Sequence, residues 1–115
     1  MSEKMGIFSK VGKILKNINP NYEQMAIDCL CDDVIVSDVL NYNNLLAGYA
    51  ISKSKLCIFG PNSNLKLDLK DIKQIKMKFG KHIIDMGNYH YEIKPAPITS
   101  NLDKYQLLIK ALNDR

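Results

Sequence analysis

The side chains best suited to chemistry in this 115-residue chain are three cysteines and two histidines. Cys29 and Cys31 lie too close in sequence for an easy disulfide bridge, and Cys57 lies in an apolar run. Catalysis by a cysteine and a histidine requires a thiolate beside an imidazole and a third, orienting group, and zinc requires three or four converging ligands. The spacing of His82 and His90 from the cysteines supports neither arrangement. We therefore expect no catalytic residue, no metal site and no cofactor.

Lysine is the residue type with the clearest functional implication. The net charge is +4, and Arg115 is the single arginine. Basic side chains around a hairpin turn or along one strand face can contact an anionic surface. Alternatively, they form a solvated face that protects the edges of a sheet from unwanted pairing. The candidate contacts to an anionic surface are Lys10, Lys13, Lys16, Lys53, Lys55, Lys76 and Lys78.

Residues 1–18 carry the pattern of a basic amphipathic helix, with apolar side chains on one stripe and lysines on the rest. One hypothesis is an anchor that lies in a membrane surface with its lysines towards anionic headgroups. The other is a helix whose stripe packs on its own domain, on a second copy or on a partner protein. The candidate partner surface consists of Ile7, Phe8, Val11, Ile14 and Leu15. No apolar run reaches the ~20 residues that a transmembrane helix needs.

The candidate residues must be positioned mainly by strands. Alternating patterns over Leu65–Leu69 and Ile75–Phe79 indicate antiparallel strands with one buried and one solvated face, with Lys76 and Lys78 facing out. Gly80-Lys81 and Gly87-Asn88 have the form of two-residue hairpin turns, and such short connections favour pairing of consecutive strands in a meander. The expected strands are Val34–Leu40, Ala47–Ile51, Lys55–Gly60, Leu65–Leu69, Gln74–Phe79, Lys81–Met86 and Tyr89–Ile93, with Asn41–Asn44 as the first loop.

Two further helices are expected to flank these strands. Asn21 begins a leading helix within residues 19–33, and Asp32-Asp33 ends it. Ser100–Asp103 has the form of a capping box, with Asp in place of Glu. It begins a helix over residues 100–113 whose apolar stripe would cover the sheet.

Seven strands followed by one amphipathic helix resemble the pleckstrin-homology-like (PH-like) superfold. Gly48–Phe59 is similar to a hairpin of bacterial PH and GRAM-like domains, Leu69–Ile75 is similar to the link into their next strand, and Tyr89–Ile93 matches their last strand. The resemblance covers roughly Val34–Leu112. It implies a mainly β (α+β) fold, a seven-stranded antiparallel half-barrel capped by a C-terminal helix. It implies no activity, because members of the family bind lipids, peptides or one another.

The sequence thus predicts a basic helix over residues 1–18 and a PH-like domain over residues 19–115. We expect a non-enzymatic, cytoplasmic module for binding or scaffolding that acts through a protein partner or as a homo-oligomer. The alternative is peripheral association with anionic lipid through the basic helix and the lysine face. Nucleic acid is not an expected partner, because single-strand binders place exposed aromatic side chains among the basic ones.

Overall fold

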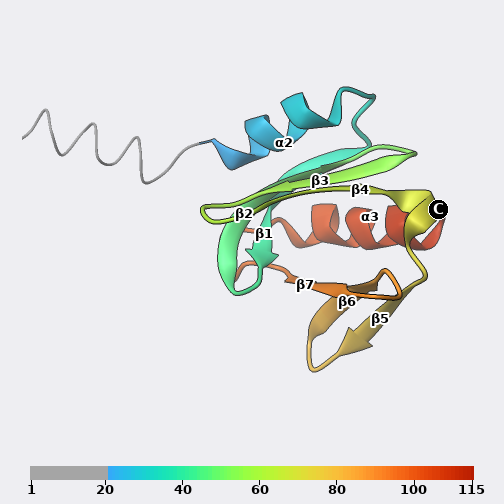
Figure 1. The fold of residues 1–115 in the computed structure, drawn as a ribbon. Coiled ribbons are helices and arrows are strands. Elements are labelled where there is room, and N and C mark those ends of the chain that lie inside the picture. Colours follow the sequence, from blue (N-terminus) through green and yellow to red (C-terminus); the bar gives the residue numbers. More distant parts are fainter. Residues whose placement is uncertain (1–20) are drawn as a thin grey trace, which may run out of the picture.

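The structure is a computed structural model that describes residues 21–115. The helix predicted over residues 1–18, with Lys10, Lys13 and Lys16 and its apolar stripe, lies outside the described residues. Two helices accompany seven strands in the described part (Figure 1). The elements are α2 (Tyr22–Leu30), β1 (Val36–Tyr42), β2 (Leu45–Ile51), β3 (Lys55–Phe59), β4 (Asn64–Asp68), the 3₁₀ turn η1 (Leu69–Asp71), β5 (Gln74–Lys78), β6 (Lys81–Asp85), β7 (His90–Lys94) and α3 (Leu102–Asn113).

The strands form one open antiparallel sheet in the order β4-β3-β2-β1-β7-β6-β5. Strands β1–β4 and β5–β7 pair consecutively, as predicted. The predicted pairing of β4 with β5 is wrong, because η1 separates the two strands and leaves them as opposite edges of the sheet. Instead β7 pairs with β1, through Asn41 with Lys94 and Tyr42 with Ile93. The mainly β, seven-stranded antiparallel fold with a C-terminal helix is thus confirmed.

The first hairpin turn differs from the prediction. Strand β1 begins two residues after Val34 and continues to Tyr42, which is buried. Asn43 and Asn44 have φ angles of 52° and 68°, as a two-residue type I′ turn requires at both of its central positions. Asparagine tolerates this left-handed conformation, so the predicted loop shortens to two residues.

The β5–β6 turn lies one residue earlier than predicted. Phe79 and Gly80 occupy the turn with φ angles of 51° and 76°, and Lys78 pairs with Lys81. The shift removes Phe79 from the strand and places it at the hairpin tip, where its exposed fraction is 91%. The predicted turn at Gly87 is confirmed, since Met86 N–H donates to the carbonyl oxygen of Tyr89 at 2.9 Å.

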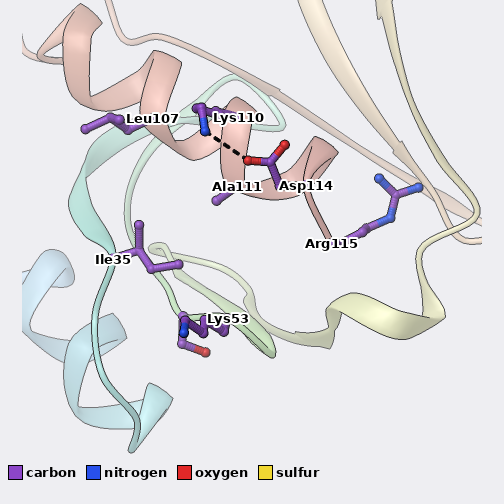
Figure 2. A pocket seen from close by; sticks show the side chains of 8 residues that line it. Ile35, Lys53, Leu107, Lys110, Ala111, Asp114 and Arg115 are labelled. Atoms are coloured by element: carbon purple, nitrogen blue, oxygen red, sulfur yellow. Dashed lines mark hydrogen bonds and ion pairs between the residues drawn. The ribbon is translucent and has the colours of Figure 1, made fainter.

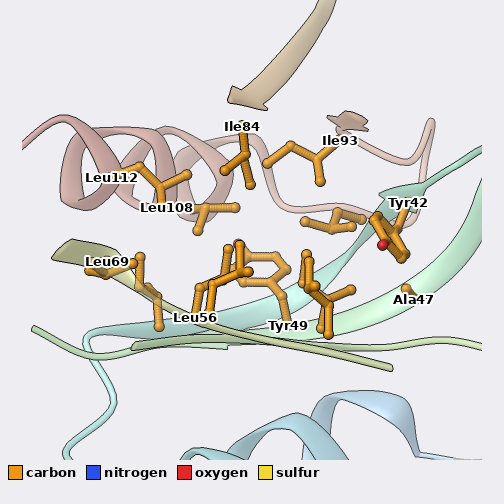
Figure 3. Packing of buried hydrophobic residues seen from close by; sticks show 14 of the residues in the cluster. Tyr42, Ala47, Tyr49, Leu56, Leu69, Ile84, Ile93, Leu108 and Leu112 are labelled. Atoms are coloured by element: carbon orange, nitrogen blue, oxygen red, sulfur yellow. The ribbon is translucent and has the colours of Figure 1, made fainter. Parts of the chain in front are cut away.

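The main core lies between the inner face of the sheet and α3, which runs between the β1–β4 half and the β5–β7 half (Figures 1 and 3). Tyr105, Leu108 and Leu112 of α3 are buried, at a spacing that places them on one helix face. The sheet contributes fully buried side chains on both halves, including Tyr49, Leu56, Ile58, Ile84 and Ile93.

Helix α3 begins one residue later than predicted. Asn101 is the N-cap, and its Oδ1 accepts a hydrogen bond from Lys104 N–H at 3.0 Å. The Ser100 hydroxyl instead donates to the carbonyl oxygen of Val39 and accepts from Ala96 N–H, each at 2.7 Å. Ser100 therefore ties the start of α3 to β1 rather than capping the helix.

Helix α2 covers the outer face of β2 and β3 (Figure 1). Its predicted start is confirmed, because Asn21 Oδ1 accepts from Gln24 N–H at 3.1 Å. A Cβ atom on Gly48 would overlap the backbone of Tyr22 and Glu23, so only glycine allows this close approach. None of the helices in residues 21–115 is long and apolar enough to cross a bilayer.

Candidate functional site

An open apolar groove lies between the β5–β6 hairpin and α3. We call it the hairpin groove. Its volume is about 380 Å³. It is lined mainly by Met77, His82, Pro95, Leu102, Tyr105 and Ile109.

Two elements that are distant in sequence build the hairpin groove. On α3, Leu102, Tyr105 and Ile109 recur at intervals of three and four residues, which places them on one face of the helix. On the hairpin, Met77 of β5 lies opposite His82 of β6. The side chains of this cross-strand pair share a face of the sheet, so the hairpin and the helix form the two walls.

The floor of the hairpin groove holds one polar pair. His82 Nδ1 lies 2.8 Å from the hydroxyl oxygen of Tyr105, and the two ring centroids are 5.5 Å apart. Burial lowers the pKa of His82 and raises the pKa of Tyr105. Both side chains are therefore favoured in their neutral forms, and the floor presents an uncharged surface to a ligand.

Large apolar side chains remain exposed around the hairpin groove. The exposed fractions are 70% for Met77 and 61% for Leu102, and Phe79 projects from the hairpin tip. The sequence pattern had assigned Met77 and Phe79 to the buried face of a strand, and this assignment is wrong. The hairpin extends away from α3 (Figure 1), and the side chains of Met77 and Phe79 are exposed instead of packed in the core. Single exposed apolar residues are ordinary, but Met77 and Leu102 line one groove, and exposed apolar residues gathered at a groove are typical of an interaction site.

A second surface cavity, which we call the basic groove, lies between the β2–β3 turn and the C-terminal half of α3 (Figure 2). Its volume is about 500 Å³, and Lys53, Lys110 and Arg115 are among its lining residues. A neighbouring cavity of about 330 Å³ shares Lys53 and Arg115 and adds Lys70. The structure thus gathers basic residues around Lys53 that the sequence analysis had not grouped with it.

Two of the cations in the basic groove are already engaged. Lys110 Nζ lies 3.1 Å from a carboxylate oxygen of Asp114 (Figure 2). The Arg115 guanidinium donates to the carbonyl oxygens of Leu112 at 2.6 Å, Lys73 at 3.2 Å and Ile72 at 3.4 Å. The arginine therefore joins the end of α3 to the segment before β5. Lys53 and Lys70 remain as the cations best placed for an external anion.

The predicted lysines do not form one patch. Lys53 is exposed in the β2–β3 turn, and Lys55 is half-buried on β3 opposite Asp68. Lys76 and Lys78 lie on β5, in the other half of the sheet. Lys10, Lys13 and Lys16 are outside the described residues, as is the candidate surface Ile7, Phe8, Val11, Ile14 and Leu15.

The cysteines and histidines occupy separate environments. Cys57 is buried under α2, Cys31 is exposed after it, and all three cysteines are free thiols. Burial, with the neighbouring Cys29 thiol, raises the pKa of Cys57 to about 12, so Cys57 is held as a thiol. Within residues 21–115, no three His, Cys, Asp or Glu side chains converge as a metal site would require.

A comparison with protein-family models and with curated proteins finds no match for this chain. The resemblance to PH-like domains therefore stays a prediction from the sequence. The site is identified from its geometry alone, and the hairpin groove is the feature that sequence analysis missed. The available signal was the pair Met77 and Phe79 beside a glycine turn, with Leu102 at the predicted start of the helix.

Proposed function

We propose that this chain is a non-enzymatic, PH-like binding module that holds an apolar segment of a protein partner in the hairpin groove. The observation that carries the proposal is the exposure of Met77 and Leu102 on the walls of a groove whose floor is uncharged, with Phe79 exposed at the neighbouring hairpin tip. A soluble partner segment would remove these side chains from water. Function at this site needs no catalytic group.

The energetics indicate what kind of partner is required. Full burial of one large apolar side chain contributes about 1.5–3 kcal/mol, and micromolar affinity needs about 8 kcal/mol in total. Met77, Phe79 and Leu102 come close to this total only if each is fully buried. Association also costs translational and rotational freedom. Polar or backbone contacts must therefore add to the apolar ones.

Leu102→Asp tests the groove without disturbing the core. Leu102 is the first residue of α3, where the helix dipole favours a carboxylate. Leu107→Asp is the matched control, because Leu107 is an exposed leucine of the same helix that lines the basic groove instead. The probes are two capped synthetic peptides of equal composition, one alternating Leu with Glu and one with an amphipathic helical pattern.

We expect at least one peptide to bind the full chain, with NMR amide shifts concentrated on β5, β6 and α3. Leu102→Asp should weaken its affinity about tenfold or more, because a charge would be desolvated in the groove, and Leu107→Asp should leave the affinity unchanged. The proposal is overturned if neither peptide binds below about 1 mM, or if both variants weaken binding equally.

The basic groove favours a second candidate function, peripheral association with anionic lipid. Lys53 and Lys70 are the observation that supports it, and the predicted lysines of residues 1–18 would add to them. Co-sedimentation of the full chain with phosphatidylcholine vesicles, with and without phosphatidylserine, tests this function. Binding should require phosphatidylserine, fall with added salt and decrease in Lys53→Glu but not in Lys104→Glu, a change on the exposed surface of α3. Equal binding to neutral vesicles would contradict it.

A further inference from the structure

Strand β5 is an edge of the open sheet, and it borders the hairpin groove. Among residues 21–115, no strand pairs with the outer edge of β5, which leaves a row of backbone donors and acceptors facing away from β6. Such an edge is a template for an added strand. Which backbone groups it presents follows from the register of the hairpin.

The two residues that flank a two-residue hairpin turn form a hydrogen-bonded pair, which here is Lys78 with Lys81. Hydrogen-bonded and non-hydrogen-bonded pairs alternate along an antiparallel ladder. Lys76 therefore directs its backbone groups towards β6, like Lys78. Ile75 and Met77 direct their N–H and C=O groups to the free edge.

The side chains of β5 are sorted in the same alternating way. Ile75 packs against the core and Met77 lines the hairpin groove, so both lie on the inner face. Lys76 and Lys78 lie on the outer face. Lys76 has a carboxylate oxygen of Asp85 at 3.6 Å. Lys78 belongs to none of the ion pairs in the described part of the chain, and its Nζ lies 5.8 Å from the centre of the Phe79 ring.

We propose that the partner of the hairpin groove binds as an added antiparallel strand on β5, through an extended segment that alternates large apolar residues with acidic ones. Residues opposite Ile75 and Met77 place their side chains on the inner face, because directly paired residues share a face, and the residue opposite Met77 lies at the groove. The acidic residues stand opposite Lys76 and Lys78, in non-hydrogen-bonded pairs that bring side chains close together. This inference rests on the proposed function and adds the conformation and charge of the partner.

A second copy of this chain fits the same edge poorly. A two-fold pairing of β5 that used both Ile75 and Met77 of each copy would place Lys76 directly opposite its own counterpart. Like charges in that position are destabilising, and Lys78 would have no carboxylate to face. The lysines therefore favour an acidic partner segment over self-association at this edge.

N-methylated peptides distinguish strand addition from binding by side chains alone. In the proposed pairing, the apolar residues of the peptide donate their N–H groups to β5, and the acidic residues direct theirs to solvent. The probe is the capped peptide that alternates Leu with Glu, compared with one version N-methylated at the Leu residues and one N-methylated at the Glu residues. Methylation at Leu should weaken binding to the full chain about tenfold or more, because two backbone hydrogen bonds are lost. Methylation at Glu should change the affinity about twofold at most.

Lys78→Glu tests the charge requirement. It places a carboxylate opposite Lys81, so a like-charged cross-strand pair becomes an oppositely charged one and the hairpin is not destabilised by the change. This variant should bind the Leu/Glu peptide more weakly and a Leu/Lys peptide more tightly, which reverses the preference of the original chain. Lys66→Glu is the control, because Lys66 is exposed on β4, the opposite edge of the sheet, and it should leave the preference unchanged.

The outcomes separate the two proposals. If methylation at Leu and at Glu weakens binding equally, or if Lys78→Glu leaves the preference unaltered, strand addition is overturned while groove binding stands. If the unmethylated Leu/Glu peptide does not bind but the helical peptide does, strand addition is again overturned. If no peptide binds, both proposals fail. Slower hydrogen exchange at the amides of Ile75 and Met77 in the bound state would support strand addition independently.

Discussion

The two faces that lie outside the main core are built from different side chains. Under α2, the sheet presents small residues: the helix backbone sits directly on Gly48, and Ala50 and Cys57 pack with Ala26 and Leu30 of the helix. Around the hairpin groove, the exposed residues are large and apolar, with Met77 and Leu102 at its walls. The surface under α2 is fitted to one fixed neighbour, the helix of the same chain. The hairpin groove instead keeps flexible side chains, such as Met77, that can adapt to a partner.

The reactivity of the thiols should differ most between Cys57, which α2 covers, and Cys31, which is exposed. Burial raises the pKa of Cys57 to about 12, so Cys57 holds far less of the reactive thiolate than a cysteine in water does at the same pH. We expect a maleimide reagent to label the exposed Cys31 at least about tenfold faster than the buried Cys57 in the folded chain, measured by peptide mass spectrometry. Equal rates would mean that α2 does not cover β3.

Two leucines of α3 provide the second test. Leu108 is fully buried in the core, whereas Leu102 borders the groove. Leu108→Ala should lower the free energy of unfolding by about 3 kcal/mol, through lost burial and a residual cavity. Leu102→Ala should lower it by less than about 0.5 kcal/mol. Urea unfolding followed by circular dichroism measures both, and a large loss in Leu102→Ala would assign the groove to the core instead of to a binding surface.

Gly48→Ala should break the fit of α2. The added methyl group would overlap the helix backbone, so we expect a loss of about 1–3 kcal/mol from overpacking. Maleimide should also label Cys57 faster in Gly48→Ala than in the original chain, because displacement of α2 exposes the outer face of the sheet. Gly60→Ala is the control, since the nearest atom to its Cβ would be the Ala47 side chain at 3.3 Å. If Gly48→Ala were as stable as Gly60→Ala, the close packing of α2 would be wrong.

The smallest effect concerns pH at the groove floor. Burial lowers the pKa of His82 in the folded chain below its ordinary value, so the unfolded chain binds the proton more readily. The stabilisation is complete above about pH 6.5 and is lost as the pH falls below it. The thermal midpoint of His82→Gln should therefore fall less between pH 7.5 and pH 5 than that of the original chain. An identical decrease in both would exclude His82 as a source of the pH dependence.

The sequence predicted most of the fold because the strands and hairpins are local features. Alternation identifies a strand within five residues, as in Leu65–Leu69, and the turn at Gly87 follows from one glycine. The predictions that were wrong required information from distant residues. Only the pairing of β1 with β7 determines that β4 and β5 become edges, and only the position of α3 determines that Met77 remains exposed.

The site was harder to predict than the fold for the same reason. The predicted lysines on β5 are now part of a specific hypothesis, but their importance depends on the neighbouring groove. That groove requires Leu102 and Ile109 to lie against Met77 and His82, residues that share no motif. No local pattern signals this juxtaposition.

The junction between β1 and β7 also has a consequence for the order of folding. It joins the two halves of the sheet through two residue pairs, and the strands involved lie far apart in the chain. Each hairpin closes a short loop, whereas this junction must close a long one before it gains any contact energy. We expect the two meanders to form first and the junction last, as α3 docks between them. The rate of folding should therefore be limited by the pairing of β7 with β1.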